Sequence, residues 1–243
     1  MNPTIQTLLS HRSVRRYTDD PVPEEHIRSA VEAGQMASTS AAVQAYCLIR
    51  VRDPEHRRRL VELTGGQEKV ARAGAFFVVC GDVRRHRVIA QRAGKPYRAR
   101  LEAFLVAAID AALFAQNMCV ALESMGLGIC YIGGLRNRLR DVDELLRLPG
   151  GVYPLFGLCV GVPDERPAPR PRLPVDAVLF EGGYPPDEVW LDALSSYDEE
   201  YEAYLRARGA APKPWTRGIA ESFTEPARGD LAAYYESKGA DLT

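Results

Sequence analysis

Positively charged side chains gather near the start of this chain, in the stretch HRSVRRYTDDPVP at residues 11–23. Four of its first six residues can carry positive charge: His11, Arg12, Arg15 and Arg16. A guanidinium presents N–H donors in a planar fork that matches the oxygens of a phosphate. In an extended segment, Ser13 and Arg15 would project to the same side. The stretch is therefore either a solvated basic run or one wall of an anion site.

Two further parts of the sequence are suited to hold an anion. Arg170 and Arg172 stand in a Pro/Arg-rich loop at residues 163–174, and neighbouring guanidinium groups repel each other unless an anion lies between them. In the stretch YIGGL, Gly133 and Gly134 would let a ligand approach backbone N–H groups closely. Together, the three features favour a bound phosphorylated cofactor.

Motifs for other kinds of chemistry are absent from the sequence. The four histidines stand apart, and none has the spacing of a metal-ligand motif, so no metal site is expected. There is no GxSxG nucleophile motif, no Walker A motif and no GxGxxG after a predicted strand. The glycines of GLGICYIGG follow a helix and flank a strand, which argues against a Rossmann dinucleotide site. No side-chain nucleophile or catalytic base is predicted.

The composition is that of an ordinary soluble globular protein of 243 residues, with 46% hydrophobic and 26% charged residues. Lysine and arginine total 31 and aspartate and glutamate total 32, a balance that argues against nucleic acid as a partner. The N-terminus lacks the features of a signal peptide, so a cytoplasmic location is expected. Five widely spaced cysteines in apolar stretches indicate buried thiols in a reducing compartment rather than disulfides: Cys47, Cys80, Cys119, Cys130 and Cys159.

Hydrophobic periodicity and turn residues divide the chain into strands and helices. Strands are predicted at residues 45–51, 75–81, 129–135 and 153–162. Helices are predicted at residues 4–9, 24–37, 98–125, 137–148, 191–208 and 229–238, with a short helix after the glycine turn in 64–73. Residues 37–44 are predicted to form a small polar loop, and the stretch GAAPKPWTRG at 209–218 is expected to be mobile.

The longest predicted helix, at residues 98–125, is apolar on nearly every face, so it must be buried or lie in a membrane. Five polar residues interrupt it too often for a bilayer span: Glu102, Asp110, Gln116, Asn117 and Glu123. It is therefore predicted to be a core helix or to pack against its twin in a dimer, and no membrane association is expected.

Six separated segments follow one another in a specific order and spacing. They are HRSVRRYTDDPVPEEHIRSAVEAG at residues 11–34, LTGGQ at 63–67, AAIDAALFAQNMCVALESMGLG at 107–128, YIGGLRN at 131–137, YPLFGLCVGVP at 153–163 and PRLP at 171–174. Together they resemble the nitroreductase/flavin reductase family, and within it the NADPH-dependent group of oxygen-insensitive nitroreductases and NADPH–flavin oxidoreductases. The resemblance extends from residue 1 to about residue 208, and more loosely to the end.

The resemblance implies an α+β fold in which helices surround a central, mostly antiparallel sheet, and an intertwined homodimer. It implies a single FMN-binding domain at residues 1–243, with a more variable region from about residue 185. One FMN would be bound tightly in each subunit at the dimer interface, and NADPH would be the hydride donor.

The same resemblance assigns roles at the FMN site. Four cationic residues would hold the phosphate: His11, Arg12, Arg170 and Arg172. Ser13 and Gln67 would bond to ribityl or ring atoms, and Arg15 would face the pyrimidine edge of the flavin, where reduction places negative charge. Backbone groups of the glycine turn would complete the site: Tyr131, Ile132, Gly133, Gly134 and Leu135. A loop of the other subunit would add three residues: Ser38, Thr39 and Ser40.

The resemblance is less specific toward the C-terminus. Three basic residues there would contact NADPH or the substrate: Arg208, Lys213 and Arg228. Relatives often have a more serine-rich loop that ends in an aromatic residue, where this chain has Ala41 and Ala42. This departure leaves the substrate range open.

The function that the resemblance implies is an FMN-dependent NADPH oxidoreductase with a ping-pong hydride transfer. Its acceptors would be nitroaromatics, quinones, azo compounds, chromate or free flavin. Because FMN carries the chemistry, no catalytic side chain is required. Two alternatives stay open. One is a reductase that supplies reduced flavin to a partner or reduces one specific metabolite, and the other is a non-catalytic flavin-binding or sensing protein.

Overall fold

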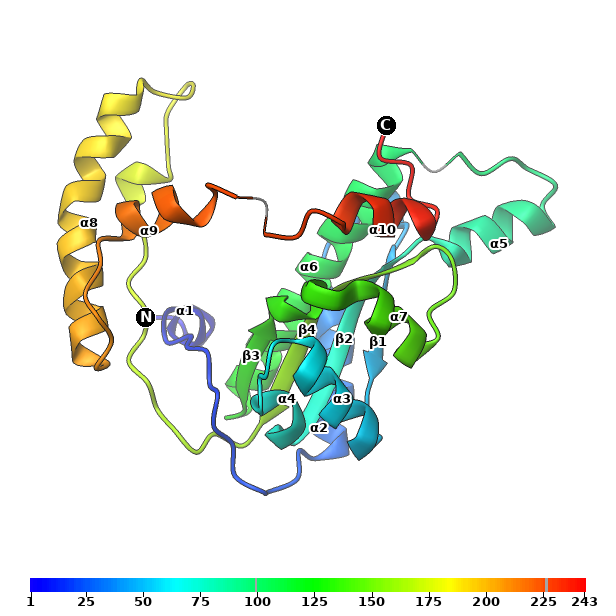
Figure 1. The fold of residues 1–243 in the computed structure, drawn as a ribbon, viewed down its shortest axis with the longest axis horizontal. Helices are drawn as coiled ribbons and strands as arrows, with labels where there is room; N and C mark the ends of the chain where they lie inside the picture. Colours follow the sequence, from blue (N-terminus) through cyan, green and yellow to red (C-terminus); the bar gives the residue numbers. More distant parts are fainter. Residues whose placement is uncertain (99, 226) are drawn as a thin grey trace. The chain divides into compact units, whose positions relative to one another are not determined.

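A four-stranded sheet forms the centre of the larger part of the chain (Figure 1). The structure is a computed structural model that describes residues 1–98, 100–225 and 227–243. The chain divides into two units, which are described separately. Unit 1 comprises Met1–Pro167 and Arg228–Thr243, and unit 2 comprises Ala168–Ala227.

All neighbouring strands of the sheet are antiparallel, in the order β1-β2-β4-β3. The four strands confirm the predicted ones to within a few residues: β1 (Tyr46–Arg50), β2 (Ala75–Asp82), β3 (Gly128–Ile132) and β4 (Val152–Gly161). The stretch 129–135 is predicted to be a strand that leads into a glycine turn. Strand β3 ends at Ile132, and the two glycines begin the 3₁₀ helix η2 (Gly133–Arg138) directly after it.

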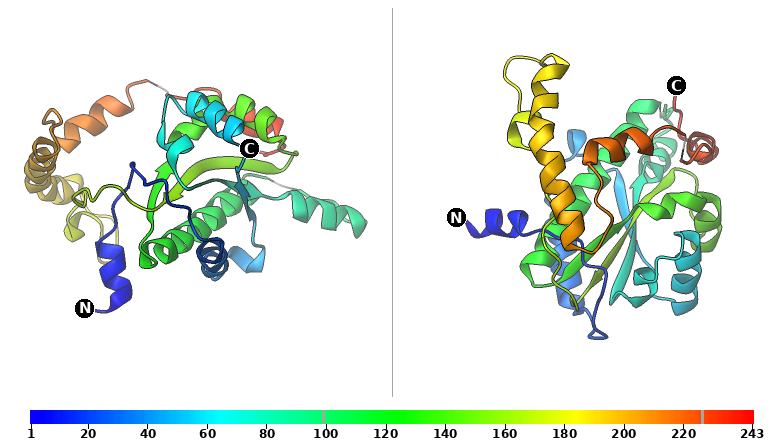
Figure 2. Two further views of the ribbon diagram at one scale, coloured as in Figure 1. Left: turned by 90° about the horizontal axis from the view of Figure 1, so that it is seen from below. Right: turned by 60° about the vertical axis from the view of Figure 1, so that its left-hand side comes forward.

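Helices cover both faces of the sheet (Figure 2). Side chains alternate along β2, so that Phe77 and Val79 belong to one hydrophobic cluster while Phe76 and Val78 belong to the other. Because every residue of β2 is buried, neither face of this strand is left to water. The first cluster contains residues of α2 (Glu24–Gln35), α6 (Leu101–Ser124) and α10 (Leu231–Ser237). The second contains residues of α3 (Pro54–Leu63) and α4 (Lys69–Arg72), and α7 (Leu139–Leu146) contributes to both.

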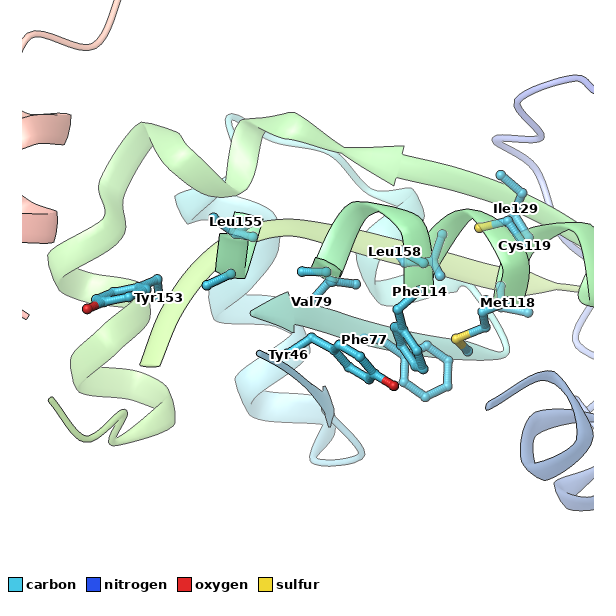
Figure 3. Packing of buried hydrophobic residues seen from close by; sticks show 14 of the residues in the cluster. Tyr46, Phe77, Val79, Phe114, Met118, Cys119, Ile129, Tyr153, Leu155 and Leu158 are labelled. Atoms are coloured by element: carbon cyan, nitrogen blue, oxygen red, sulfur yellow. The ribbon is translucent and has the colours of Figure 1, made fainter. Parts of the chain in front are cut away.

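Helix α6 is a core helix of unit 1, as predicted (Figure 3). Its length and composition would suit a membrane span, but the face that carries Phe114 is buried against the sheet and α2. The Phe114 ring stacks on that of Tyr46 in β1, with centroids 4.5 Å apart. A Cβ on Gly34 would lie 2.7 Å from Cε2 of Phe114, so this glycine allows α2 to approach α6. Residue 99, at the predicted start of the helix, lies outside the described residues.

Four shorter helical elements complete unit 1: α1 (Pro3–Leu9), the 3₁₀ turn η1 (Ser40–Ala42), α5 (Arg84–Arg92) and α10 (Leu231–Ser237). Sequence analysis places no helix at α3 or α5. The sequence does contain an N-cap signal for α3: the Asp53 side chain accepts the backbone N–H groups of Glu55 and His56, and Pro54 occupies the first helical position. Helix α5 has no buried residue, so it lacks the apolar stripe that reveals a helix.

Unit 2 contains η3 (Val175–Ala177), α8 (Asp187–Ala207) and α9 (Trp215–Ser222). The predicted helix at 191–208 begins earlier, after Pro186. The prediction that residues 209–218 form a mobile stretch is corrected, because helix α9 begins inside it. Asp198 of α8 accepts the backbone N–H of Thr216 at 2.9 Å, and the Trp215 ring packs on Tyr197, 5.6 Å between centroids. These tertiary contacts stabilise α9 and are invisible to local sequence patterns.

Candidate functional site

The basic N-terminal segment is extended and lies along β3, an edge strand of the sheet. Val14 donates its N–H to the carbonyl of Ile129 in β3 at 2.9 Å, and Ser13 forms a parallel bridge with the same residue. A Cβ on Gly128 would lie 2.8 Å from Cβ of Val14, so the glycine makes room for the segment. Val14 is buried, whereas Ser13 and Arg15 are not. The segment is extended, as the prediction that Ser13 and Arg15 project to one side requires, and the residue between them is the one that is buried.

A carboxylate from the loop after β4 fixes the backbone of this segment. Oε1 of Glu165 accepts the N–H of Arg15 at 2.6 Å and that of Arg16 at 3.2 Å. Oε2 of the same carboxylate lies 3.4 Å from Nε of Arg16. Glu165 therefore binds the segment through its backbone and leaves the Arg15 side chain available. No feature of the local sequence reveals this role.

The cationic side chains of the segment have different partners. Nδ1 of His11 bonds to Oε1 of Glu123, near the end of α6, at 2.7 Å. The guanidinium of Arg12 donates to the carbonyls of Ser10 and Pro167, and that of Arg15 donates to the carbonyl of Ser13, two residues earlier. Among the described residues, neither arginine is paired with a carboxylate.

This donor set fits the phosphate of a flavin mononucleotide. A guanidinium bound only by carbonyls keeps its full positive charge and has N–H groups left for an anion. Arg12 also lines a surface pocket of about 450 Å³, together with Gly128 and Glu165. The buried Val14 also lines the pocket, so part of its wall comes from the same segment that carries the arginines.

The second part of the candidate site is a pair of adjoining turns. Gln67 donates its side-chain N–H to the carbonyl of Thr64 at 2.9 Å, and Gly65 and Gly66 take φ values of 85° and 75° to make this turn. A Cβ on Gly134 would lie 2.5 Å from that Thr64 oxygen and would collide with Nε2 of Gln67. The structure thus brings Gln67 against the predicted 131–135 turn, and Gly134 is needed for this packing.

Two of the three side chains of the 131–135 turn are buried, and the third, that of Tyr131, is partly buried. Ile132 and Leu135 are fully buried, and the Tyr131 ring packs edge-on against Phe156 at 5.3 Å. Burial raises the pKa of the Tyr131 hydroxyl far above its ordinary value, so the phenol stays neutral. The buried side chains of Ile132 and Leu135 leave the backbone groups of the turn as its predicted contribution to a ligand. Gly133 is half-buried beside them.

One basic residue of the C-terminal region lies near this turn. Nε of Arg228 donates to Oδ1 of Asn137 at 3.0 Å. Nδ2 of Asn137 in turn lies 3.4 Å from where a Cβ on Gly65 would be. Arg228 is thus close to the two turns that carry Gln67 and Gly134.

The loop that contains Ser38, Thr39 and Ser40 lies elsewhere in unit 1. The N–H of Ser40 bonds to Oδ1 of Asp110, in the middle of α6, at 3.2 Å. His11 contacts the same helix at Glu123, about 20 Å farther along its axis at 1.5 Å per residue. Within one chain, therefore, the structure does not bring this loop to the basic segment.

The remaining predicted residues belong to unit 2. Arg172 donates to the carbonyl of Arg170 at 3.1 Å, and both side chains are exposed. Arg208 donates to the hydroxyl of Tyr204 at 2.8 Å, with its guanidinium 5.4 Å from the ring centroid. Lys213 is paired with Glu221, so its charge is compensated within the unit.

Two carboxylates that bind backbone N–H groups of predicted site segments were not predicted from the sequence: Glu165 and Asp110. Asp110 had a signal, because it is a charged residue on the apolar face of a predicted helix. Glu165 had none. Among the residues that the structure describes, no group of three or more His, Cys, Asp or Glu side chains is placed to hold a metal ion.

Comparison with known proteins assigns the chain to a family. The family model described as "Nitroreductase family" matches residues 8–162, and the model described as "Nitroreductase family, C-terminal domain" matches residues 170–243. The chain belongs to the nitroreductase family. This confirms the resemblance found in the six sequence segments.

Relatives of this nitroreductase-family protein match it over nearly its whole length. It is 44% identical to the FMN reductase (NADPH) of Bacillus subtilis and 39% identical to the oxygen-insensitive NADPH nitroreductase of Salmonella typhimurium, each over 98% of both chains. The solved structure of the NADPH:FMN oxidoreductase from Vibrio harveyi complexed with NAD⁺ has a TM-score of 0.91 at 38% identity and covers 100% of both chains. The antiparallel sheet between helices is the nitroreductase fold, as predicted.

Proposed function

We propose that this nitroreductase-family protein is an FMN-dependent NADPH oxidoreductase. The observation that carries the proposal is the pair of guanidinium groups of Arg12 and Arg15. Both are presented on a backbone fixed by β3 and Glu165, and neither is neutralised by a carboxylate in the described part of the chain. Relatives that match the chain over nearly its full length are named FMN reductase (NADPH) and oxygen-insensitive NADPH nitroreductase.

In this proposal, the basic residues bind different parts of FMN. Arg12 binds the phosphate, with further contacts from the three other cations assigned to it: His11, Arg170 and Arg172. Arg15 faces the pyrimidine edge of the flavin ring, where a fixed positive charge stabilises the negative charge that reduction creates. Ser13, Gln67 and the backbone of the 131–135 turn orient the ribityl chain and the ring.

FMN, when bound, would supply the redox chemistry of a ping-pong hydride transfer from NADPH to an acceptor. The protein's own task is to bind and orient both substrates, because orientation alone lowers the barrier for hydride transfer. Arg208, Lys213 and Arg228 are proposed contacts for NADPH or the acceptor. Nitroaromatics, quinones, azo compounds, chromate and free flavin are the acceptors that suit such a site.

We further propose that the working form is a homodimer. Four apolar side chains recur at every fourth residue of α6 and are each between 39% and 52% exposed: Leu101, Leu105, Ile109 and Leu113. A continuous exposed apolar stripe of this kind favours burial against another surface. A second copy would also bring its loop with Ser38, Thr39 and Ser40 to the flavin of the first.

A second candidate function is the supply of reduced flavin to a partner protein. The name of the Bacillus subtilis relative, FMN reductase (NADPH), favours it. The two functions differ in whether reduced flavin leaves the protein.

Steady-state kinetics of the FMN-loaded protein test the proposal. NADPH oxidation with menadione or nitrofurazone, measured over a grid of both substrates, should give the parallel reciprocal plots of a ping-pong mechanism. Turnover with free FMN as the only acceptor would support the second candidate. Absence of NADPH oxidation with every acceptor would contradict both functions and leave a flavin-binding protein without catalysis.

A further inference from the structure

The loop that leads into β1 is held by a carboxylate buried in the core. Asp110 is fully buried, on the face of α6 that packs against the sheet. Its Oδ1 accepts the N–H of Ser40 at 3.2 Å and its Oδ2 accepts the N–H of Ala45 at 3.0 Å. No ion pair involves Asp110 within the described ranges. A buried carboxylate is tolerated only where its oxygens are hydrogen-bonded, so Asp110 and the loop depend on each other.

The loop backbone is strained. Ala41, Ala42 and Gln44 take φ values of 46°, 57° and 49°, which are left-handed conformations that residues with a Cβ rarely adopt. All three side chains are exposed, so their own packing does not hold them there. Strain of this kind persists only where surrounding contacts impose it, and it is concentrated at functional sites.

Contacts from two helices impose this conformation. On one side, Asp110 binds backbone N–H groups, and Phe114, one turn later in α6, stacks on Tyr46 directly after the loop. On the other side, the His86 ring donates to the carbonyl of Val43 at 2.7 Å, and Arg85 donates to the carbonyl of Tyr46. The loop is therefore held through its backbone by α5 and α6, while the side chains of Ala41, Ala42 and Gln44 are exposed.

We infer that Asp110 is a positioning residue for the flavin site. It fixes the 38–44 loop in the conformation in which Ser38, Thr39 and Ser40 contact the flavin of a second subunit. The inference rests on the proposed function, which assigns the loop to that site. Ile109 is exposed on the same helix, in the apolar stripe, so one rigid element carries both the loop anchor and the surface proposed to meet the second copy.

The variant Asp110→Asn tests this role in the full-length protein. It keeps the size of the side chain but replaces one acceptor oxygen with an amide that cannot accept a backbone N–H. We expect the Kd for FMN, measured well below the melting temperature, to rise about tenfold. Hydrogen exchange of peptides covering residues 38–45 should become at least tenfold faster, while peptides from β2 stay protected.

Asp53→Asn is the matched control. The Asp53 carboxylate also accepts two backbone N–H groups, from Glu55 and His56, but at the start of α3. This variant should leave both the Kd for FMN and the exchange of the loop at wild-type values, even if it lowers the melting temperature.

A second variant, Ala42→Gly, covers the case in which Asp110→Asn does not fold. Glycine adopts the left-handed conformation without strain and lets the loop leave it, so the melting temperature should hold or rise. Looser positioning should still speed exchange of the loop and raise the Kd for FMN severalfold.

The outcomes separate the inference from the proposed function. Wild-type FMN affinity and loop protection in Asp110→Asn, with only a lowered melting temperature, would show that Asp110 merely stabilises the fold and would overturn the inference. Unchanged FMN affinity in Ala42→Gly would also count against it. If the wild-type protein itself fails to bind FMN, the proposed function is wrong, and this role falls with it.

Discussion

Nδ1 of His11 lies 2.7 Å from Oε1 of Glu123, which joins the basic N-terminal segment to the end of α6. The carboxylate is the better buried of the two groups, with 13% of its side chain exposed against 28% for the histidine. Since Nδ1–H is donated to the carboxylate, the ring is oriented with Nε2 on its other side. Helix α6 thus holds the basic segment at its end and the 38–44 loop at its middle, through Asp110.

Arg12→Ala should weaken FMN binding. A charge-assisted hydrogen bond contributes about 1.5–3 kcal/mol, which corresponds to a roughly ten- to hundredfold higher Kd at about 1.4 kcal/mol per decade. Flavin fluorescence quenching during titration measures this Kd. Arg16→Ala is the control, because Arg16 is exposed and lies next to Glu165. Equal weakening by both substitutions would mean that net charge, rather than a specific contact of Arg12, retains the flavin.

Arg208→Ala should reduce the preference for NADPH over NADH. The two donors differ only by the 2′-phosphate, so loss of one phosphate contact should lower the ratio of the kcat/KM values by about ten- to a hundredfold. The KM for NADPH should rise while the kinetics with NADH stay nearly constant. Arg206→Ala provides the comparison, since Arg206 is engaged with Glu202 one helical turn away. If activity falls equally with both donors, Arg208 has a structural role only.

Ile109→Asp should disrupt the homodimer. The side chain is 52% exposed in the single chain, so a charge there does not disturb the core of unit 1 but would be buried without a partner in an interface. Light scattering should show a monomer, and FMN binding should decline. Arg58→Asp on α3, which covers the opposite face of the sheet, should remain dimeric. A dimer that survives Ile109→Asp would place the interface elsewhere.

Cys47 should be the most reactive thiol of the native protein. It lies opposite Cys80 in the β1–β2 register, and a hydrogen bond from that thiol lowers the pKa of Cys47 below the ordinary value. Burial raises the pKa of Cys119 to about 12, and Cys80, Cys130 and Cys159 are also buried, as predicted. Cys47 was predicted to be buried as well, but it is half-buried.

A lowered pKa means that thiolate is present at a lower pH than for a free cysteine. The rate of Cys47 alkylation by iodoacetamide should therefore rise with pH with a midpoint below that of an ordinary thiol. Mass spectrometry of the modified peptides identifies the site, and Cys47→Ser should remove the fast phase. A fast phase that persists in Cys47→Ser would assign it to another cysteine.

Sheet and core could be predicted from the sequence because burial leaves a periodic signal. Phe76 to Val79 are apolar without interruption, as a strand covered on both faces requires, and α6 is apolar nearly all round. Helix α5 could not be predicted in this way because it buries nothing, and α9 depends on Asp198 of another helix. The strand order likewise depends on pairing between distant segments.

The candidate site likewise contains residues that the sequence predicts and residues that it does not predict. The residue types arginine and glycine by themselves indicate anion binding, so Arg12 and Gly134 could be predicted as site residues. In the structure, Gly134 is also needed for packing against Gln67 and Thr64. Glu165 was not found, because its function is to bind backbone N–H groups 150 residues away in the chain. Local sequence contains no trace of such a contact.

In the proposed function, this chain binds FMN and passes electrons from NADPH through it. Anaerobic titration of the purified, FMN-loaded protein with NADPH tests it most directly. The visible absorbance of the protein-bound flavin should bleach with one equivalent of NADPH per flavin and return when menadione is added. A protein that does not retain FMN, or whose bound flavin keeps its oxidised spectrum in excess NADPH, would contradict the claim.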